Sequence, residues 1–330
     1  MFGLNETCTP DKPLSVELVT HGISLSSIPV YGLTFYIIIF KCPAVFDQYR
    51  ILLLRHLVCC LFMEIHMSIF WLMDIVVPSA AICANGLAYD YPRLMFLVLV
   101  LSIIISAWSI FVLFEYRMEA VTSDEEKGMK TMARYLKYLC YVVFIITIIL
   151  GIISLKWTTN DISYKMKMEK IHGPMPSFVW CDNCIFADAT SIFVILFYSW
   201  GVASVLIAMT YCIVTIGISV VGLEKMKKSM SAKTLALQRN FLISLFLMCA
   251  VHITFIAIPV GIYLTTFFIT YPSKYMILSY VCVIFVTQHG FGSTVMLLTT
   301  NKSIRKVALD MVFRRKTSDQ IFLSRPKASG

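Results

Sequence analysis

Long uninterrupted runs of apolar residues alternate along this chain with short segments that carry most of the charge. Seven of these runs are long enough to cross a bilayer as helices, which takes about 20 residues. Backbone polar groups in lipid must be satisfied within the segment, so the pattern predicts an all-α membrane protein, a seven-transmembrane helix bundle of residues 19–300. The predicted spans are residues 19–40, 53–78, 94–115, 138–156, 190–221, 240–266 and 275–300.

The distribution of positive charge predicts the orientation of the bundle. With residues 1–18 outside, the segments on the cytoplasmic side contain about three times as many Lys and Arg residues as the outer segments. Cytoplasmic loops carry this bias, so we expect the N-terminus outside and the C-terminus inside the plasma membrane. The sequon that begins at Asn5 is then an outer glycosylation site.

The low fraction of charged residues indicates which partners the chain has. Only 14% of the 330 residues are charged, and the mean hydropathy is +0.80, whereas a soluble domain carries about 25% charged residues. The net charge of +9 therefore indicates a cationic face against membrane lipid, and we expect no nucleic-acid partner. The tail, residues 301–330, begins with basic and apolar positions that predict an amphipathic helix over residues 301–316 on the inner membrane surface; a solvated basic tail is the alternative.

Four cysteines lie in segments that the orientation places outside the cell, where thiols oxidise. We expect a disulfide from Cys83 to either Cys184 or Cys181, which would tether the longest outer loop to the bundle, and Cys8 is left for the remaining cysteine. The sequence does not choose among these pairings. It contains no Gly-rich phosphate loop, no metal-ligand spacing and no nucleophile elbow, so we expect neither an enzyme nor a cofactor.

Three ionisable residues interrupt the apolar runs at a common predicted depth. Glu64, His252 and His289 each lie about 13 residues from a basic residue at the inner edge, or roughly 20 Å along a helix. Buried ionisable groups in lipid usually find partners. One hypothesis is a polar switch in which Glu64 contacts His289, with His252 nearby; the alternative is that each bonds separately to a backbone carbonyl or a hydroxyl.

The outer halves of the spans offer a hinge and a pocket. Pro259 removes a helix hydrogen bond in the sixth span and predicts a hinge there, or else a kink tolerated by packing. Aromatic residues at this level would suit an apolar ligand pocket, although an aromatic belt at the membrane interface has the same pattern. The pocket candidates are Phe197, Tyr198, Tyr263 and Tyr280.

Short motifs at the ends and centres of three spans carry family information. The chain reads Phe-Glu-Tyr-Arg at 114–117, Lys-Thr-Leu-Ala-Leu-Gln at 233–238, and His-Gly-Phe-Gly-Ser-Thr at 289–294. From about residue 23 to residue 309, these segments resemble the nematode serpentine chemoreceptors, most closely class H of that superfamily or its sister class I.

The resemblance implies a G-protein-coupled receptor for external chemicals such as odorants or pheromone-like molecules, located on the cilia of sensory neurons. It implies that Glu115, Tyr116 and Arg117 meet the heterotrimeric G protein, whereas the residues alone would fit ordinary flanking charge. Seven spans would also fit a ligand-gated ion channel or a small transporter. The predicted outer N-terminus opposes the seven-span channels of insects, whose N-terminus lies inside.

Overall fold

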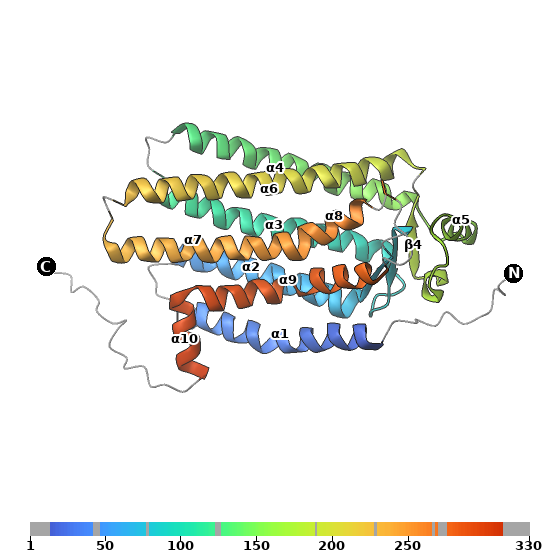
Figure 1. Ribbon diagram of the computed structural model, residues 1–330, viewed down its shortest axis with the longest axis horizontal. Coiled ribbons are helices and arrows are strands. Elements are labelled where there is room, and N and C mark those ends of the chain that lie inside the picture. The colour runs from blue at the N-terminus through green and yellow to red at the C-terminus, as the bar shows by residue number, and fades with distance from the viewer. Residues whose placement is uncertain are drawn as a thin grey trace.

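The computed structural model describes residues 14–41, 47–76, 79–122, 127–188, 190–227, 230–265, 268–269 and 276–312. Within them, seven helical segments are long and apolar enough to cross a membrane, and they lie side by side as one bundle (Figure 1). The predicted seven-helix fold is confirmed. The spans are α1 (Leu14–Phe40), α2 (Asp47–Ile65) with η2 (His66–Trp71), α3 (Pro92–Val121), α4 (Lys127–Ser154), α6 (Ile192–Met226), α7 (Ala232–His252) with η7 (Ile253–Ala257) and α8 (Ile258–Thr265), and α9 (Met276–Thr300).

The two ends of the bundle differ in structure. One end carries a cap of short strands and helices, and we call it the outer end, following the predicted orientation. At the opposite, inner end, α10 (Lys302–Val312) crosses the bundle (Figure 1). Ile304 of α10 packs into the main core, while Leu309 is 48% exposed, so the helix is amphipathic as predicted over its described part. Residues 313–316 of the predicted tail helix lie outside the described residues.

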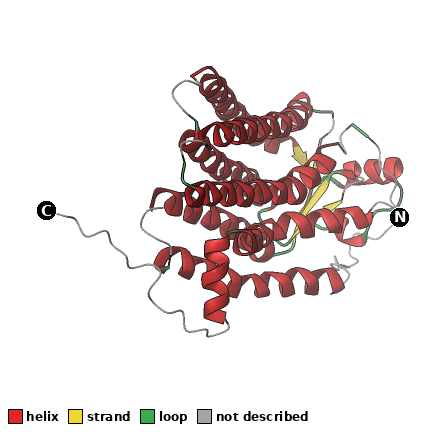
Figure 2. Ribbon diagram, turned by 60° about the vertical axis from the view of Figure 1, so that its left-hand side comes forward, coloured by secondary structure: helices red, strands yellow, loops and turns green. Residues whose placement is uncertain are grey.

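The cap is a small antiparallel sheet, which the sequence did not predict. Among the described residues the sheet has four strands in the order β1-β2-β4-β3, and Figure 2 shows them gathered at one end of the helices. Three further short helices belong to the cap. The cap elements are β1 (Met73–Val76), β2 (Ala81–Ala84), η5 (Leu155–Trp157), β3 (Thr158–Thr159), α5 (Ile162–His172), η6 (Ser177–Trp180) and β4 (Cys184–Ala187).

The second predicted span, residues 53–78, was too long at its outer end. The helix ends at Trp71, and Leu72 takes a left-handed conformation with a φ of 45°. The chain then turns into β1, where Asp74 accepts a hydrogen bond of 2.6 Å from Asn85. Most residues of β1 are apolar, since the strand packs on the bundle. Hydropathy alone therefore predicted the helix and the strand as one continuous span.

Candidate functional site

An apolar cavity of about 190 Å³ lies between the spans. Its walls come from α3, α4, α6 and the α7–η7–α8 span, so four spans meet around it. Gly201 contributes to the wall from α6, and a Cβ there would stand 3.1 Å from the Leu264 side chain, so glycine lets Leu264 of α8 pack closely against α6. The few polar groups in the wall are Thr147, Ser204 and His252, besides the sulfurs of two cysteines.

Of the four predicted pocket residues, one lines the cavity and three do not. Phe197 lines the cavity. Tyr198 and Tyr263 are buried and share a hydrogen bond of 2.6 Å between their hydroxyl groups, which joins α6 to α8. Tyr280 is not among the residues that line this cavity. The cavity therefore lies deeper in the bundle than the aromatic residues suggested.

The sixth span changes its helical geometry beside the cavity. Ile253–Ala257 forms one turn of π-helix, in which the amide of Ile258 bonds to the carbonyl of Ile253. Pro259 follows directly, and it has no N–H to donate to the carbonyl of Phe255, so the regular ladder cannot continue there. Such π-turns often mark functional sites. The wall of the cavity includes Ile253, Ile256 and Ala257 of this turn.

The predicted polar layer forms in part, with different partners. His252 and His289 lie edge to face, with ring centroids 5.4 Å apart. Glu64 instead accepts a hydrogen bond of 3.1 Å from the Tyr31 hydroxyl of α1, and no hydrogen bond among the described residues joins it to His289. The expected Glu64–His289 contact is therefore replaced by Tyr31–Glu64. A third histidine that the sequence reading missed, His56, lies with its ring centroid 5.2 Å from that of His252.

The Glu115–Arg117 motif lies within α3, since this helix extends to Val121 rather than ending at residue 115. Arg117 is 3% exposed, and its Nη1 donates a hydrogen bond of 2.9 Å to Gln238 of α7. Its guanidinium also lies over the rings of Tyr49 and Phe241, at 4.0 and 4.3 Å. Glu115 pairs separately with Lys137 of α4. Neighbouring charges in the motif thus bridge α3 to two different spans.

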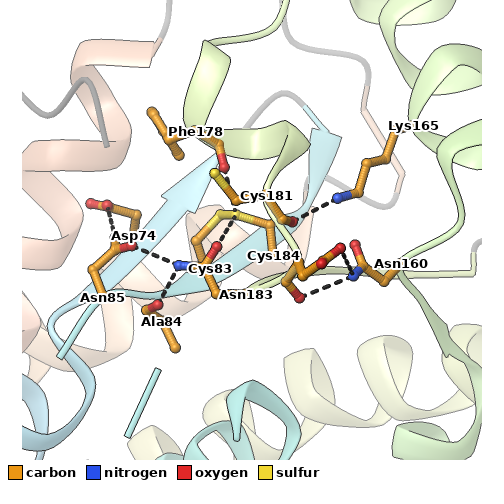
Figure 3. Close-up of a disulfide and its surroundings, with 11 residues drawn as sticks. Asp74, Cys83, Ala84, Asn85, Asn160, Lys165, Phe178, Cys181, Asn183 and Cys184 are labelled. Carbon is orange, nitrogen blue, oxygen red and sulfur yellow. Dashed lines mark hydrogen bonds between the residues drawn. A yellow bond between two sulfur atoms is a disulfide. The ribbon is translucent and has the colours of Figure 1, made fainter. Parts of the chain in front are cut away.

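A disulfide joins Cys83 of β2 to Cys184 of β4, which are opposite each other in the sheet. Of the pairings that the sequence left open, the structure contains this one, and Cys181 also forms a disulfide. Figure 3 shows Asn183 beside the bond, where its side chain donates to the Ala84 carbonyl at 2.5 Å. Cys8 and Asn5 lie outside the described residues.

The cap also buries a lysine. Lys165 of α5 is 1% exposed and donates a hydrogen bond of 2.8 Å to the Cys181 carbonyl (Figure 3). Burial lowers the pKa of Lys165 from its ordinary value of 10.5 to about 8, and the Asp182 carboxylate acts in the opposite direction. The side chain therefore joins α5 to the loop before β4 while its charge is poorly solvated.

A seven-span bundle with an apolar cavity among its helices and a bridged inner end has the architecture of a heptahelical receptor. The sequence matches the family model for the serpentine type 7TM GPCR chemoreceptor Srh over residues 11–314. The chain therefore belongs to the Srh family of chemoreceptors, a multi-pass membrane family, and the resemblance to class H is confirmed. No curated protein and no solved structure matches the chain.

Proposed function

We propose that this chemoreceptor binds a small apolar molecule between its spans and activates a heterotrimeric G protein in response. The observation that carries the proposal is the cavity of about 190 Å³. An engineered apolar cavity of about 150 Å³ in a soluble protein binds benzene. A ligand of roughly ten non-hydrogen atoms therefore suits this site.

The hydroxyl groups in the wall favour an apolar ligand, because they are already engaged. Ser204 donates to the Trp200 carbonyl at 2.7 Å, and Thr147 donates to the Val143 carbonyl at 2.8 Å. The two hydroxyls also lie 3.0 Å apart. A polar ligand would have to replace these bonds, whereas an aliphatic or aromatic one leaves them intact. Shape and apolar contact would therefore decide which molecule binds.

The sixth span offers a route from the ligand to the inner end. Its π-turn lines the cavity, and Gln238 lies in the inner half of the same span. Conversion of the π-turn to regular helix would rotate the inner half of α7 relative to α8. That rotation would remove Gln238 from Arg117 and open the inner end to the G protein. A ligand that fits the converted turn better would shift the population toward the open state.

The proposed orientation places residues 1–18 outside the cell and α10 on the cytoplasmic surface of the plasma membrane, with sensory cilia as the expected location. Glycosylation of Asn5 tests the orientation directly. Treatment with a glycosidase should increase the gel mobility of the wild type expressed in cells but not that of Asn5→Gln. An N-terminal tag that is reachable only after permeabilisation would contradict this orientation.

The proposed function is tested with a G-protein dissociation sensor in cells that express the receptor, against a panel of volatile and lipid-like molecules. We expect responses to small apolar members of the panel that disappear in cells lacking Gα subunits. A ligand-evoked current that persists in those cells would instead identify a channel. Uptake of the molecule without a G-protein response would identify a transporter.

A further inference from the structure

Three potential metal ligands converge at the centre of the bundle. A nitrogen of His56, the sulfur of Cys60 and a nitrogen of His252 all lie within 4.8 Å of one another. His56 and Cys60 are one turn apart on α2, so both side chains point to the same side of that helix. His252 is the last residue of α7, directly before the π-turn. His56 and Cys60 are fully buried, and His252 is 9% exposed.

Hydrogen bonds around the cluster fix the tautomer of each imidazole. The Ser109 hydroxyl donates to the Ser106 carbonyl at 2.6 Å, so toward Nδ1 of His56, 2.8 Å away, it acts as an acceptor. His252 likewise donates from Nδ1 to the Met248 carbonyl at 3.0 Å. Both Nε2 atoms therefore carry lone pairs. That of His56 lies 3.3 Å from the Ser293 hydroxyl and 3.5 Å from the Cys60 sulfur, and that of His252 lies 3.3 Å from the Ser106 hydroxyl, so a metal would replace these long hydrogen bonds. Metal-bound histidines are usually oriented by this kind of bond from the other nitrogen.

His289, which lies beside the cluster, carries a buried acceptor that has no hydrogen-bond donor among the described residues. Its Nδ1 donates to the Val286 carbonyl at 2.9 Å, which again leaves the lone pair on Nε2. This Nε2 is buried and has no hydrogen-bond partner among the described residues, although the ring lies beside His252. A buried acceptor without a partner costs about 1–3 kcal/mol. The unpaired lone pair of His289 would favour a positive charge at the neighbouring cluster.

We propose that His56, Cys60 and His252 bind a single Cu(I) ion. Two imidazoles and one thiolate form a donor set typical of copper, and they offer no oxygen anion for Ca²⁺ or Mg²⁺. The thiolate cancels the charge of Cu(I), so the complex is neutral, whereas Zn²⁺ would leave a net positive charge in the apolar interior. Binding exchanges the thiol proton of Cys60, which leaves to water, for a Cu–S bond, and no electron is transferred.

At this position a bound ion would affect the conformation of the sixth span. It would link α2 to α7 at the residue where the regular helix gives way to the π-turn. His252 also lines the cavity, so one side chain would contact both the metal and the space for a ligand. Bound Cu(I) would restrain the turn and thereby modulate ligand binding. The metal site itself does not depend on the proposed coupling to a G protein.

The test is anaerobic titration of the receptor, purified in lipid nanodiscs, with Cu(I) buffered by a bathocuproine chelator. We expect one Cu(I) per wild-type chain. Cys60→Ser should weaken binding at least about tenfold, as loss of a ligand requires. Cys59→Ser is the matched control, because Cys59 is the adjacent residue of α2, carries a free thiol and is only partly buried. Cys59→Ser should bind as tightly as the wild type.

A second variant and a spectrum keep the result interpretable if Cys60→Ser folds poorly. His252→Gln should also weaken Cu(I) binding about tenfold, and thermal unfolding without metal reports whether each variant is folded. X-ray absorption of the wild-type complex should show one sulfur and two nitrogen neighbours around copper. Equal affinity of Cys60→Ser and Cys59→Ser, absence of binding, or displacement of Cu(I) by equimolar Zn²⁺ would overturn the assignment.

Discussion

Gln238 accepts a hydrogen bond of 2.9 Å from Nη1 of Arg117, and this bond joins the inner ends of α7 and α3. The guanidinium is otherwise held by the faces of Tyr49 and Phe241, since its Nε and Nη2 have no hydrogen-bond partner among the described residues. The hydrogen bond to Gln238 and the contacts with the rings of Tyr49 and Phe241 therefore hold Arg117 between α2, α3 and α7. Because a hydrogen bond between a charged and a neutral group contributes about 1.5–3 kcal/mol, a modest change can release it.

Two substitutions at Gln238 should change the basal activity of the receptor, measured without ligand, in opposite directions. Gln238→Ala removes the acceptor, and the loss of about 1.5 kcal/mol corresponds to a roughly tenfold increase in the open population. Gln238→Glu places a carboxylate opposite the guanidinium, and this ion pair should be stronger than the wild-type bond, so basal activity should fall below that of the wild type. Basal G-protein dissociation at matched surface expression measures both. Changes of the same sign in the two variants would contradict the role of this bond.

The cavity should be sensitive to added volume at Ala208 but not at Ala203. Both alanines lie on α6 and are partly buried, and only Ala208 lines the cavity. Ala208→Leu adds three carbon atoms to a space of about 190 Å³, so the ligand concentration for half-maximal response should rise at least about tenfold. Ala203→Leu is the control. Equal potency in the two variants would place the ligand elsewhere.

Hydropathy predicted the bundle because each span is a continuous segment of the chain. It did not predict the sheet, in which β2 pairs with β4 across about 100 residues of intervening chain. The strands have four residues at most and are apolar on the side that packs against the helices. β1 therefore read as the end of the second predicted span, while the other strands fell in segments predicted as loops, because strands this short are distinguished only by their pairing.

The sequence predicted which residues lie at the same depth in the membrane, but not which of them are in contact. Glu64 and His289 lie at similar predicted depth, but depth does not fix the direction in which each helix turns its side chain. Glu64 faces Tyr31 of α1, while His289 faces His252. Arg117 was singled out because the family resemblance implies a role for it at the inner end. Gln238 is the last residue of the motif at 233–238, but nothing in the sequence indicated that these two residues meet.

The Cys83–Cys184 disulfide should support the cap. Cys83→Ala should lower stability by about 2–5 kcal/mol, a usual cost of losing a native disulfide, and reduce surface expression. The double variant Cys83→Ala, Cys184→Ala should resemble the single variant, because the second change removes no further bond. Thermal unfolding in nanodiscs measures the effect. Cys59→Ala is the control, since Cys59 is a free cysteine on α2; a loss as small as in this control would contradict the prediction.

The buried amine of Lys165 should make the cap more stable as the pH rises. Its pKa is about 8 in the folded protein and near the ordinary value of 10.5 when unfolded. Between these values the unfolded chain binds more protons, so the free energy of unfolding increases with pH. Below pH 8 the cost of the buried charge is present in full. The difference in melting temperature between Lys165→Met and the wild type should therefore decrease from pH 7 to pH 10.

The control for this titration is Lys167→Met, which changes an exposed lysine of the same helix. Its melting temperature should follow that of the wild type at every pH. Parallel curves for Lys165→Met and the wild type would mean that Lys165 does not change protonation in this range. Because the amine also donates to the Cys181 carbonyl, the variant is compared by its pH dependence and not by its stability at a single pH.

Tyr31 and Glu64 should be coupled energetically, whereas Glu64 and His289 should act independently. The Tyr31 hydroxyl donates to one carboxyl oxygen of Glu64 at 3.1 Å, and the other oxygen is buried without a partner among the described residues. Tyr31→Phe removes a hydrogen bond from this buried carboxyl group, at a cost of about 1–3 kcal/mol. Once Glu64→Gln has changed that group, the loss of the hydroxyl should cost less. A double-mutant cycle on thermal stability should give a coupling above about 0.5 kcal/mol for Tyr31→Phe with Glu64→Gln. The cycle of Glu64→Gln with His289→Gln should be additive, and strong coupling in that cycle would restore the contact expected from depth alone.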